Sequence, residues 1–190
     1  MTLGTLLKLA TAVGAYALIA SSLVEAMDKS GHAPGVSKNG SIQVPNVDFR
    51  KEWSVLGAWV VNGDDGENAK GIHNVYTQPS TIDAYRKTGK FPDGAVLVKE
   101  LLTTKTQDMT TGTIGYADKI EGWFVMVKDT KGRFPDNKLW GDGWGWAFFK
   151  GGNRAKTTST DYEADCKGCH IPARKTDWIY TEAYPVLKGK

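Results

Sequence analysis

The sequence predicts one β-rich α+β domain, with an antiparallel sheet of about five strands and a few short helices. Two observations favour this fold. Short runs of aromatic and β-branched residues are separated mostly by turn residues, which is typical of strands joined by hairpins. The chain has 190 residues, 41% of them hydrophobic, which is enough for one core, and no internal repeat divides it.

The predicted elements follow one another along the chain. Aromatic and β-branched side chains mark five strands, at 53–61, 72–76, 95–103, 122–128 and 144–150. A short helix is expected over 79–87, because proline is favoured in a first helical turn and Gly89 ends the pattern. A C-terminal helix is expected over 161–169, and the tail over 177–187 should pack back on the domain.

The N-terminus has the pattern of an export signal. Lys8 precedes an apolar segment over 9–24, and Val24-Glu25-Ala26 has small residues where a signal peptidase reads them. We predict a signal peptide over 1–26, a flexible arm over 27–46 and a folded domain over 47–190. An uncleaved signal anchor is the alternative, and either form places the domain outside the cytoplasm, in the periplasm.

The charge of the chain is nearly balanced. Its 24 basic and 21 acidic residues give a formal net charge of +3, and they are scattered along the sequence. This pattern favours neither nucleic acid nor an anionic membrane as a partner.

The strongest motif lies near the C-terminus. Cys166-Lys167-Gly168-Cys169-His170 has the C-x-x-C-H spacing of covalent c-type haem attachment. Two thiols on one helical turn can each add to a haem vinyl group, and the adjacent His170 can then bind the iron through a ring nitrogen. The sequence therefore predicts one haem c, held by Cys166 and Cys169 with His170 as an axial ligand.

Other interpretations of the two cysteines are weaker. A disulfide between them would close a small, strained loop, and a redox dithiol would need a thioredoxin-like context that this sequence lacks. A zinc site would need two more ligands, and only His32 and His73 remain among the histidines and cysteines.

Lys99 is unusual for its position in the strand predicted over 95–103. Strand alternation places it on one face with Leu97 and Leu101, both apolar. One interpretation is a lysine that reaches solvent at a strand edge. The other is a desolvated lysine with a lowered pKa, which would present a neutral, nucleophilic amine beside the haem.

Several segments together resemble the cytochrome P-460 family, which includes the cytochromes c′-beta. The likeness covers about 49–187 and includes the haem motif. Besides that motif it consists of His73-Asn74-Val75-Tyr76, Thr88-Gly89-Lys90-Phe91-Pro92-Asp93-Gly94, Val98-Lys99-Glu100-Leu101, Val127-Lys128-Asp129, Trp146-Ala147-Phe148, Lys175-Thr176-Asp177 and Tyr184-Pro185-Val186-Leu187. It is the order and spacing of these segments that is specific.

The resemblance implies a mostly β fold, a homodimer and one five-coordinate haem c. Cytochromes P-460 oxidise hydroxylamine, and in them a lysine that matches Lys99 is bonded covalently to the haem macrocycle. A distal glutamate acts as the base in these enzymes, and Phe124 stands at that position here. Phenylalanine cannot accept a proton. The resemblance places another polar distal residue of the family at His73, which could serve as a base or hydrogen-bond donor, with a surface or propionate contact as its alternative.

Three functions follow from these observations. The first is hydroxylamine oxidation, with electrons passed to an acceptor cytochrome. The second is nitric oxide binding or scavenging without hydroxylamine turnover, as in the c′-beta branch, for which an apolar pocket around Phe124 is suited. The third is plain electron transfer, in which Met109 or Met126 would fill the sixth position on the iron.

Overall fold

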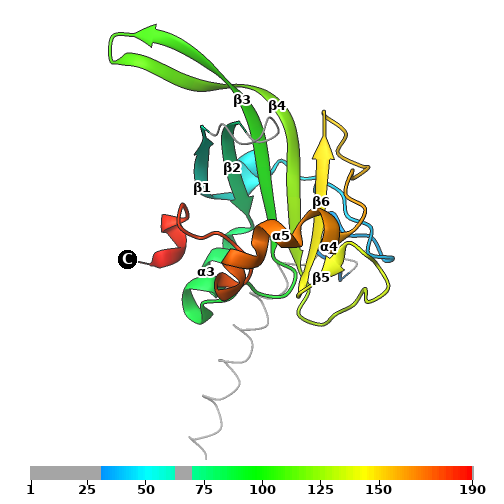
Figure 1. Ribbon diagram of the computed structural model, residues 1–190. Helices are drawn as coiled ribbons and strands as arrows, with labels where there is room; N and C mark the ends of the chain where they lie inside the picture. The colour runs from blue at the N-terminus through cyan, green and yellow to red at the C-terminus, as the bar shows by residue number, and fades with distance from the viewer. Residues whose placement is uncertain (1–30, 63–69, 190) are drawn as a thin grey trace, which may run out of the picture.

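The computed structural model describes residues 31–62 and 70–189, so the signal peptide predicted over 1–26 lies outside the described residues. Six strands form one antiparallel sheet in the order β1-β2-β3-β4-β6-β5 (Figure 1). They are β1 (Ser54–Val61), β2 (Gly71–Thr77), β3 (Val96–Met109), β4 (Gly112–Lys128), β5 (Trp140–Gly141) and β6 (Trp144–Lys150). The predicted β-rich α+β fold is confirmed, and the two-residue strand β5 is an addition at one edge.

Strands β3 and β4 are much longer than the sequence pattern predicts. Beyond the sheet they continue as a two-stranded arm, paired from Thr104 opposite Ala117 to Met109 opposite Gly112 (Figure 1). Most side chains of this arm are threonine or charged residues and nearly all are exposed, so the hydrophobic pattern of the core ends before the strands do. The backbone hydrogen bonds between β3 and β4 continue through the arm, although its side chains are no longer buried.

One face of the sheet carries the helices and the C-terminal segment. These are α3 (Pro79–Thr88), α4 (Tyr162–Asp165), α5 (Lys167–His170), and the 3-10 helices η1 (Ile171–Thr176) and η2 (Pro185–Lys188). Their apolar side chains share one core with alternate residues of the strands, among them Val75, Leu97, Met126 and Trp146. We call this side of the sheet the helical face. The predicted packing of the tail over 177–187 is confirmed, since Ile179 and Leu187 are buried in this core.

The other face is covered by the N-terminal segment, which ends in α2 (Phe49–Glu52). Ile42 and Val44 are buried against this face, although they belong to the segment predicted to be a flexible arm. The composition of this segment, rich in glycine, serine and lysine, favoured a mobile arm. The burial of its two apolar side chains holds the segment on the sheet instead. Glu100 also points to this side, because its position alternates with that of Lys99 in β3.

The helix predicted over 161–169 is broken in the structure. Tyr162–Asp165 and Lys167–His170 form two short helices, and Cys166 between them has φ −129° and ψ −44°. The side chain of Asp165 accepts hydrogen bonds from the backbone N–H groups of Thr160 and Asp161, at 2.7 and 3.1 Å, and so caps the start of the first helix. The second helix therefore carries Cys169 and His170, and the junction carries Cys166.

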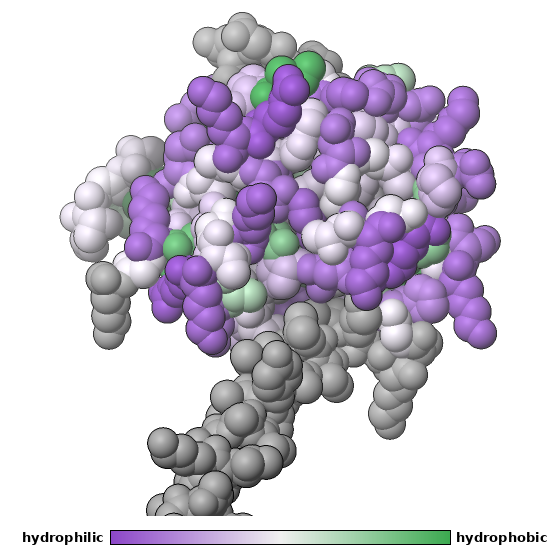
Figure 2. Space-filling view, turned by 90° about the horizontal axis from the view of Figure 1, so that it is seen from below, coloured by the Kyte–Doolittle hydropathy of each residue, from purple (hydrophilic) through white to green (hydrophobic). Residues whose placement is uncertain are grey.

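The surface seen from below is mostly hydrophilic, and its hydrophobic residues form small, separate areas (Figure 2). Such scattered apolar residues are normal for a folded domain in water. Within 31–62 and 70–189, none of the helices has the length and apolar character that crossing a bilayer requires.

Candidate haem site

The strands bring Lys99 and Phe124 side by side on the helical face. Lys99 of β3 pairs with Val75 of β2 on one side and with Phe124 of β4 on the other. Phe124 in turn pairs with Phe148 of β6. Because side chains alternate along each strand, this row lies on the same side as the buried Leu97, Met126 and Trp146. The helix α5, which carries His170, covers this same face (Figure 1).

The amine of Lys99 is held in an apolar environment. Its Nζ lies 5.5 Å from the centroid of the Phe124 ring. Burial lowers the pKa of Lys99, because the charged amine loses hydration that its surroundings do not replace. The positive charge of Lys99 also contributes to lowering the pKa of His170, so the two side chains interact electrostatically across the site. This environment favours the desolvated lysine over the solvent-reaching one.

Phe124 forms an aromatic pair with Phe148. Their ring centroids are 4.4 Å apart and the rings are nearly parallel, with an interplanar angle of 24°. Phe124 is 38% exposed, so one side of this pair is open on the helical face. Sequence analysis did not single out Phe148. The alternation in 144–150 would have found it, because Phe148 stands two residues from Trp146 on the same side of β6.

His73 lies in the centre of the sheet on β2. It pairs with Trp59 of β1 and with Leu101 of β3, and its side chain is 2% exposed. It stands two residues from Val75, so it shares the helical face and is a diagonal neighbour of Lys99 across β2 and β3. A surface position for His73 is therefore wrong, because its side chain is buried in the structure.

The imidazole of His170 has a fixed orientation. Its Nδ1 lies 2.7 Å from the backbone carbonyl oxygen of Trp178, which can only accept, so Nδ1 carries the proton and donates. The ring also contacts the edge of Trp146, with centroids 4.8 Å apart and an angle of 75°. Burial lowers the pKa of His170, against the opposing effect of the Trp178 carbonyl. Nε2 of a neutral imidazole then keeps the lone pair that a metal needs.

Cys166 immediately precedes α5, and Cys169 lies within it. Cys166 packs against the core of the helical face, and burial raises the pKa of its thiol to about 11. Cys169 is exposed, and its backbone carbonyl accepts a hydrogen bond from the Tyr180 hydroxyl at 2.7 Å. Both are free thiols, which is the form that adds to vinyl groups.

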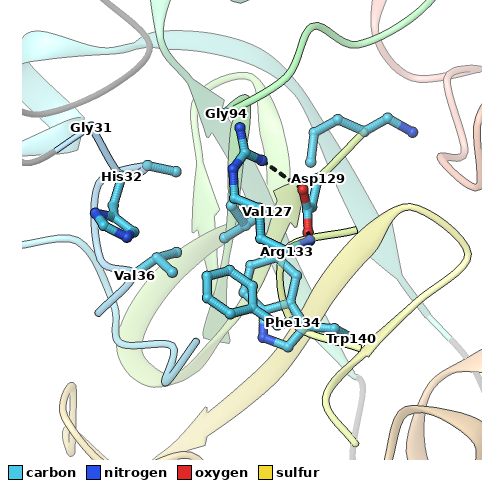
Figure 3. Close-up of a pocket in the computed structure, with 11 residues that line it drawn as sticks. Gly31, His32, Val36, Gly94, Val127, Asp129, Arg133, Phe134 and Trp140 are labelled. Atoms are coloured by element: carbon cyan, nitrogen blue, oxygen red, sulfur yellow. Dashed lines mark hydrogen bonds and ion pairs between the residues drawn. The ribbon is translucent and has the colours of Figure 1, made fainter. Parts of the chain in front are cut away.

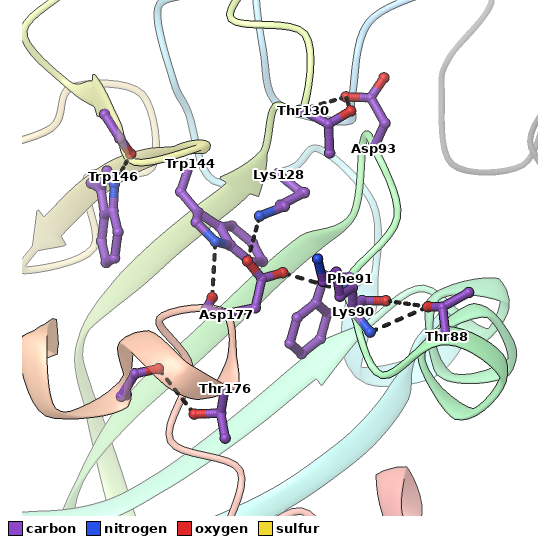
Figure 4. A network of polar contacts seen from close by, with 12 residues as sticks. Thr88, Lys90, Phe91, Asp93, Lys128, Thr130, Trp144, Trp146, Thr176 and Asp177 are labelled. Carbon is purple, nitrogen blue, oxygen red and sulfur yellow. Dashed lines mark hydrogen bonds and ion pairs between the residues drawn. The ribbon is translucent and has the colours of Figure 1, made fainter.

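A network of polar contacts fixes the backbone that holds His170 (Figure 4). Asp177 and Trp178 both have left-handed backbone conformations, with φ 59° and 67°. The Asp177 carboxylate accepts from Lys128 Nζ at 2.6 Å and from the Phe91 N–H at 3.3 Å. Its backbone carbonyl accepts from the Trp144 indole at 3.0 Å. This network ties the segment after the haem motif to β4 and β6, and thereby sets the direction of the Trp178 carbonyl.

The family model for cytochrome P460 matches residues 47–181, which is most of the folded domain. The chain belongs to the cytochrome P460 family. It is therefore a haem-binding cytochrome, and the family implies a c-type haem as its cofactor. No curated protein sequence matches the chain.

The residues around the motif of this cytochrome P460 fit a haem. An apolar, partly open aromatic surface stands beside two free thiols, and an imidazole with a protonated Nδ1 directs its other nitrogen away from the backbone. A flat macrocycle needs such a combination of apolar wall and fixed ligand. Among the described residues, no group of three His, Cys, Asp or Glu side chains gathers to hold a bare metal ion, which disfavours the zinc interpretation.

The methionines considered as sixth ligands lie in different places. Met109 stands at the far end of the β3–β4 arm, opposite Gly112, and is exposed. Met126 is buried in the core of the helical face, between Leu97 and Trp146 in the strand register. Only Met126 shares a face with His170, and its packing is that of a core residue.

A separate pocket lies between the N-terminal segment and the end of β4 (Figure 3). Arg133 bridges Asp93 and Asp129 beside it, and His32, Phe134 and Trp140 complete its wall. Its volume of about 20 Å³ is far below the 300 Å³ or more that a small-molecule ligand needs. His32 therefore belongs to a packed junction away from the haem motif.

Proposed function

We propose that this cytochrome is an exported mono-haem c protein that oxidises hydroxylamine at a five-coordinate haem and passes the electrons to an acceptor cytochrome. The observation that carries the proposal is Lys99. Its amine lies 5.5 Å from the centroid of the Phe124 ring on the face that α5 covers, and burial lowers its pKa and so favours the neutral form. These are the conditions under which a lysine becomes a nucleophile toward a bound macrocycle.

The residues of the chain have distinct roles in this proposal. Cys166 and Cys169 hold the haem through thioether bonds, His170 binds the iron through Nε2, and Lys99 bonds to the macrocycle. The haem iron supplies the centre that binds the hydroxylamine nitrogen and takes up its electrons. The Trp178 carbonyl keeps His170 in one tautomer and one orientation.

Hydroxylamine oxidation releases protons together with electrons, so the site needs a proton acceptor. Phe124 and Phe148 supply none, since both are hydrocarbon side chains. His73 is buried on the same face, with Lys99 as its diagonal neighbour, and a neutral imidazole ring carries one nitrogen that can accept a proton. We assign proton transfer to His73, either directly or through one water.

Optical spectra and turnover test the proposal. The haem-loaded protein should reduce an artificial acceptor with hydroxylamine and show a red-shifted ferrous Soret band. Lys99→Arg should abolish the red shift while both thioether bonds remain, whereas Lys105→Arg, an exposed lysine of the same strand, should leave it unchanged. No acceptor reduction by fully haem-loaded protein would overturn hydroxylamine oxidation, and an unchanged Lys99→Arg spectrum would overturn the cross-link.

Nitric oxide binding is a second candidate function, and the Phe124–Phe148 pair favours it. An apolar aromatic wall suits a small neutral diatomic ligand better than a polar substrate. Tight five-coordinate nitric oxide binding with negligible hydroxylamine turnover would establish this function in place of the first. Phe124→Glu should then introduce hydroxylamine turnover, because it supplies a carboxylate base on the same face.

The proposal includes a homodimer in the periplasm. An isolated two-stranded hairpin is marginally stable in water, and the β3–β4 arm exposes Met109 and Tyr116. A second copy of the chain that packs on this arm would cover them. Light scattering at micromolar concentration tests the dimer, and N-terminal sequencing of the exported protein tests cleavage after Ala26.

A further inference from the structure

Asp142 lies beside the haem motif, in the two-residue turn between β5 and β6. Asp142 and Gly143 both have positive φ, 52° and 79°, as a tight hairpin turn with an Asp-Gly sequence requires. This conformation brings its carboxylate within 2.5 Å of the Tyr162 hydroxyl and within 3.3 Å of Lys167 Nζ. The Asp142 side chain is 35% exposed, so its carboxylate also reaches solvent.

Tyr162 connects Asp142 to the proposed axial ligand through a series of aromatic rings. The Tyr162 ring stacks on Trp146, with centroids 4.9 Å apart and an angle of 22°. Trp146 contacts the imidazole of His170 edge-on, with centroids 4.8 Å apart. Tyr162 and Trp146 are each 2% exposed. The rings thus form a continuous, buried path from His170 to a carboxylate in contact with water.

Tyrosine and tryptophan are the side chains that most readily lose an electron. A phenol that loses an electron becomes a strong acid, so its oxidation is easiest where a base already accepts its hydrogen bond. Asp142 provides this base. Burial, together with the hydrogen bond to Asp142, raises the pKa of Tyr162, so the phenol keeps its proton until it is oxidised.

We propose that Trp146 and Tyr162 form an electron relay that protects the bound haem after a hydroperoxide has oxidised it, with Asp142 as the proton acceptor. This relay rests on His170 as the axial ligand, which belongs to the function proposed above. It does not depend on whether the substrate is hydroxylamine or nitric oxide.

The electrons and protons of the relay balance. The hydroperoxide takes two electrons from the haem, its O–O bond breaks, and with two protons from solvent it leaves as water and an alcohol, or as two waters. Tyr162 returns one electron through Trp146, its O–H bond breaks, and the proton moves to Asp142. A small-molecule reductant of the ascorbate class then reduces the Tyr162 radical, which regains its proton, and supplies the second electron to the haem.

Rapid-freeze electron paramagnetic resonance of the haem-loaded protein mixed with hydrogen peroxide tests the relay. The wild type should give a tyrosyl radical whose spectrum narrows when ring-deuterated tyrosine is incorporated. Tyr162→Phe keeps the ring stack but loses the hydroxyl, and should lose most of this signal and bleach several-fold faster. Asp142→Asn keeps Tyr162 but removes the base, and should lower the radical yield several-fold.

Two further tyrosines make the result specific. Tyr116→Phe on the β3–β4 arm should leave the signal and the bleaching rate unchanged. Tyr180 lies 5.8 Å from the His170 ring, but its hydroxyl donates to a backbone carbonyl, so Tyr180→Phe should also have little effect. A signal that persists in Tyr162→Phe, or that disappears in Tyr180→Phe instead, would overturn the relay.

Ligand chemistry at the iron separates the relay from the proposed function. Tyr162→Phe should retain wild-type hydroxylamine turnover or nitric oxide affinity in single measurements without peroxide. If the wild type and every variant lack both hydroxylamine turnover and nitric oxide binding, the proposed function is refuted and the radical result still stands. A protein that takes up no haem would overturn both.

Discussion

Breaking the ion pair between Lys128 and Asp177 should destabilise the fold and disturb His170 together. We consider Asp177→Asn, because asparagine tolerates the left-handed conformation that residue 177 adopts and nearly matches aspartate in shape. The substitution removes the charge that faces Lys128 Nζ at 2.6 Å. It also leaves one acceptor oxygen where the carboxylate has two, so either Lys128 Nζ or the Phe91 N–H loses its hydrogen-bond acceptor.

The magnitude follows from the burial of the pair. The side chains of Lys128 and Asp177 are 9% and 16% exposed, so a lone lysine charge there is poorly hydrated. Removing one partner of a buried ion pair costs about 3–5 kcal/mol, and because the amide oxygen can still accept one hydrogen bond we expect about 3 kcal/mol for Asp177→Asn. The exposed pair of Lys105 and Asp118, with side chains 57% and 24% exposed, should contribute less than about 1 kcal/mol.

Urea unfolding of the haem-free protein measures these differences, and Asp118→Asn is the matched control. The double variant with Lys128→Met should recover part of the loss, because it removes the unpaired charge as well. In the haem-loaded protein, Asp177→Asn should shift the iron–histidine stretching frequency, since the Trp178 carbonyl loses its anchor. Equal costs for Asp177→Asn and Asp118→Asn would refute this reasoning.

Two other predictions concern the helical face. Lys99→Met should stabilise the haem-free protein at neutral pH. Burial lowers the pKa of Lys99 below 10.5 in the folded protein, so the unfolded chain binds more protons than the folded one. The stability of the wild type therefore rises with pH up to about 10.5. The advantage of the variant in urea unfolding should therefore shrink as the pH is raised through that window, and a constant difference would contradict it. Gly57→Ala should cost at least about 2 kcal/mol by the same assay, because its Cβ would lie 1.8 Å from the Ala183 carbonyl oxygen, whereas Gly115→Ala in the arm has open space and should be near neutral.

The strands of the sheet were predictable because alternate side chains along them pack into the cores on its two faces, which leaves a regular pattern of apolar and β-branched residues in the sequence. Alternation in 95–103 placed Lys99 among apolar neighbours, and the register confirms its place on the helical face. The arm beyond Thr103 was missed for the same reason, since polar strands have no periodic apolar signal. The break at Cys166 was missed because it is a change of backbone conformation at one residue, with φ −129°, inside a pattern that is otherwise typical of a helix.

The candidate site was predictable where side-chain chemistry defines it. The C-x-x-C-H spacing identifies Cys166, Cys169 and His170 as haem-attachment residues. Strand alternation gives the face of the sheet on which Lys99 lies. The partner of His170 does not, because it is a backbone carbonyl, and every residue type has one. Its orientation depends on Asp177 and Lys128, which are 49 residues apart and meet only in the folded chain.

Covalent attachment of haem at the C-x-x-C-H motif is the central claim, and the intact mass of the denatured protein tests it most directly. The protein is produced in a host competent for cytochrome c assembly and treated with a thiol-alkylating reagent. The account predicts one haem added to the chain, with neither Cys166 nor Cys169 alkylated. A chain without haem that carries the alkyl group on both cysteines would contradict it.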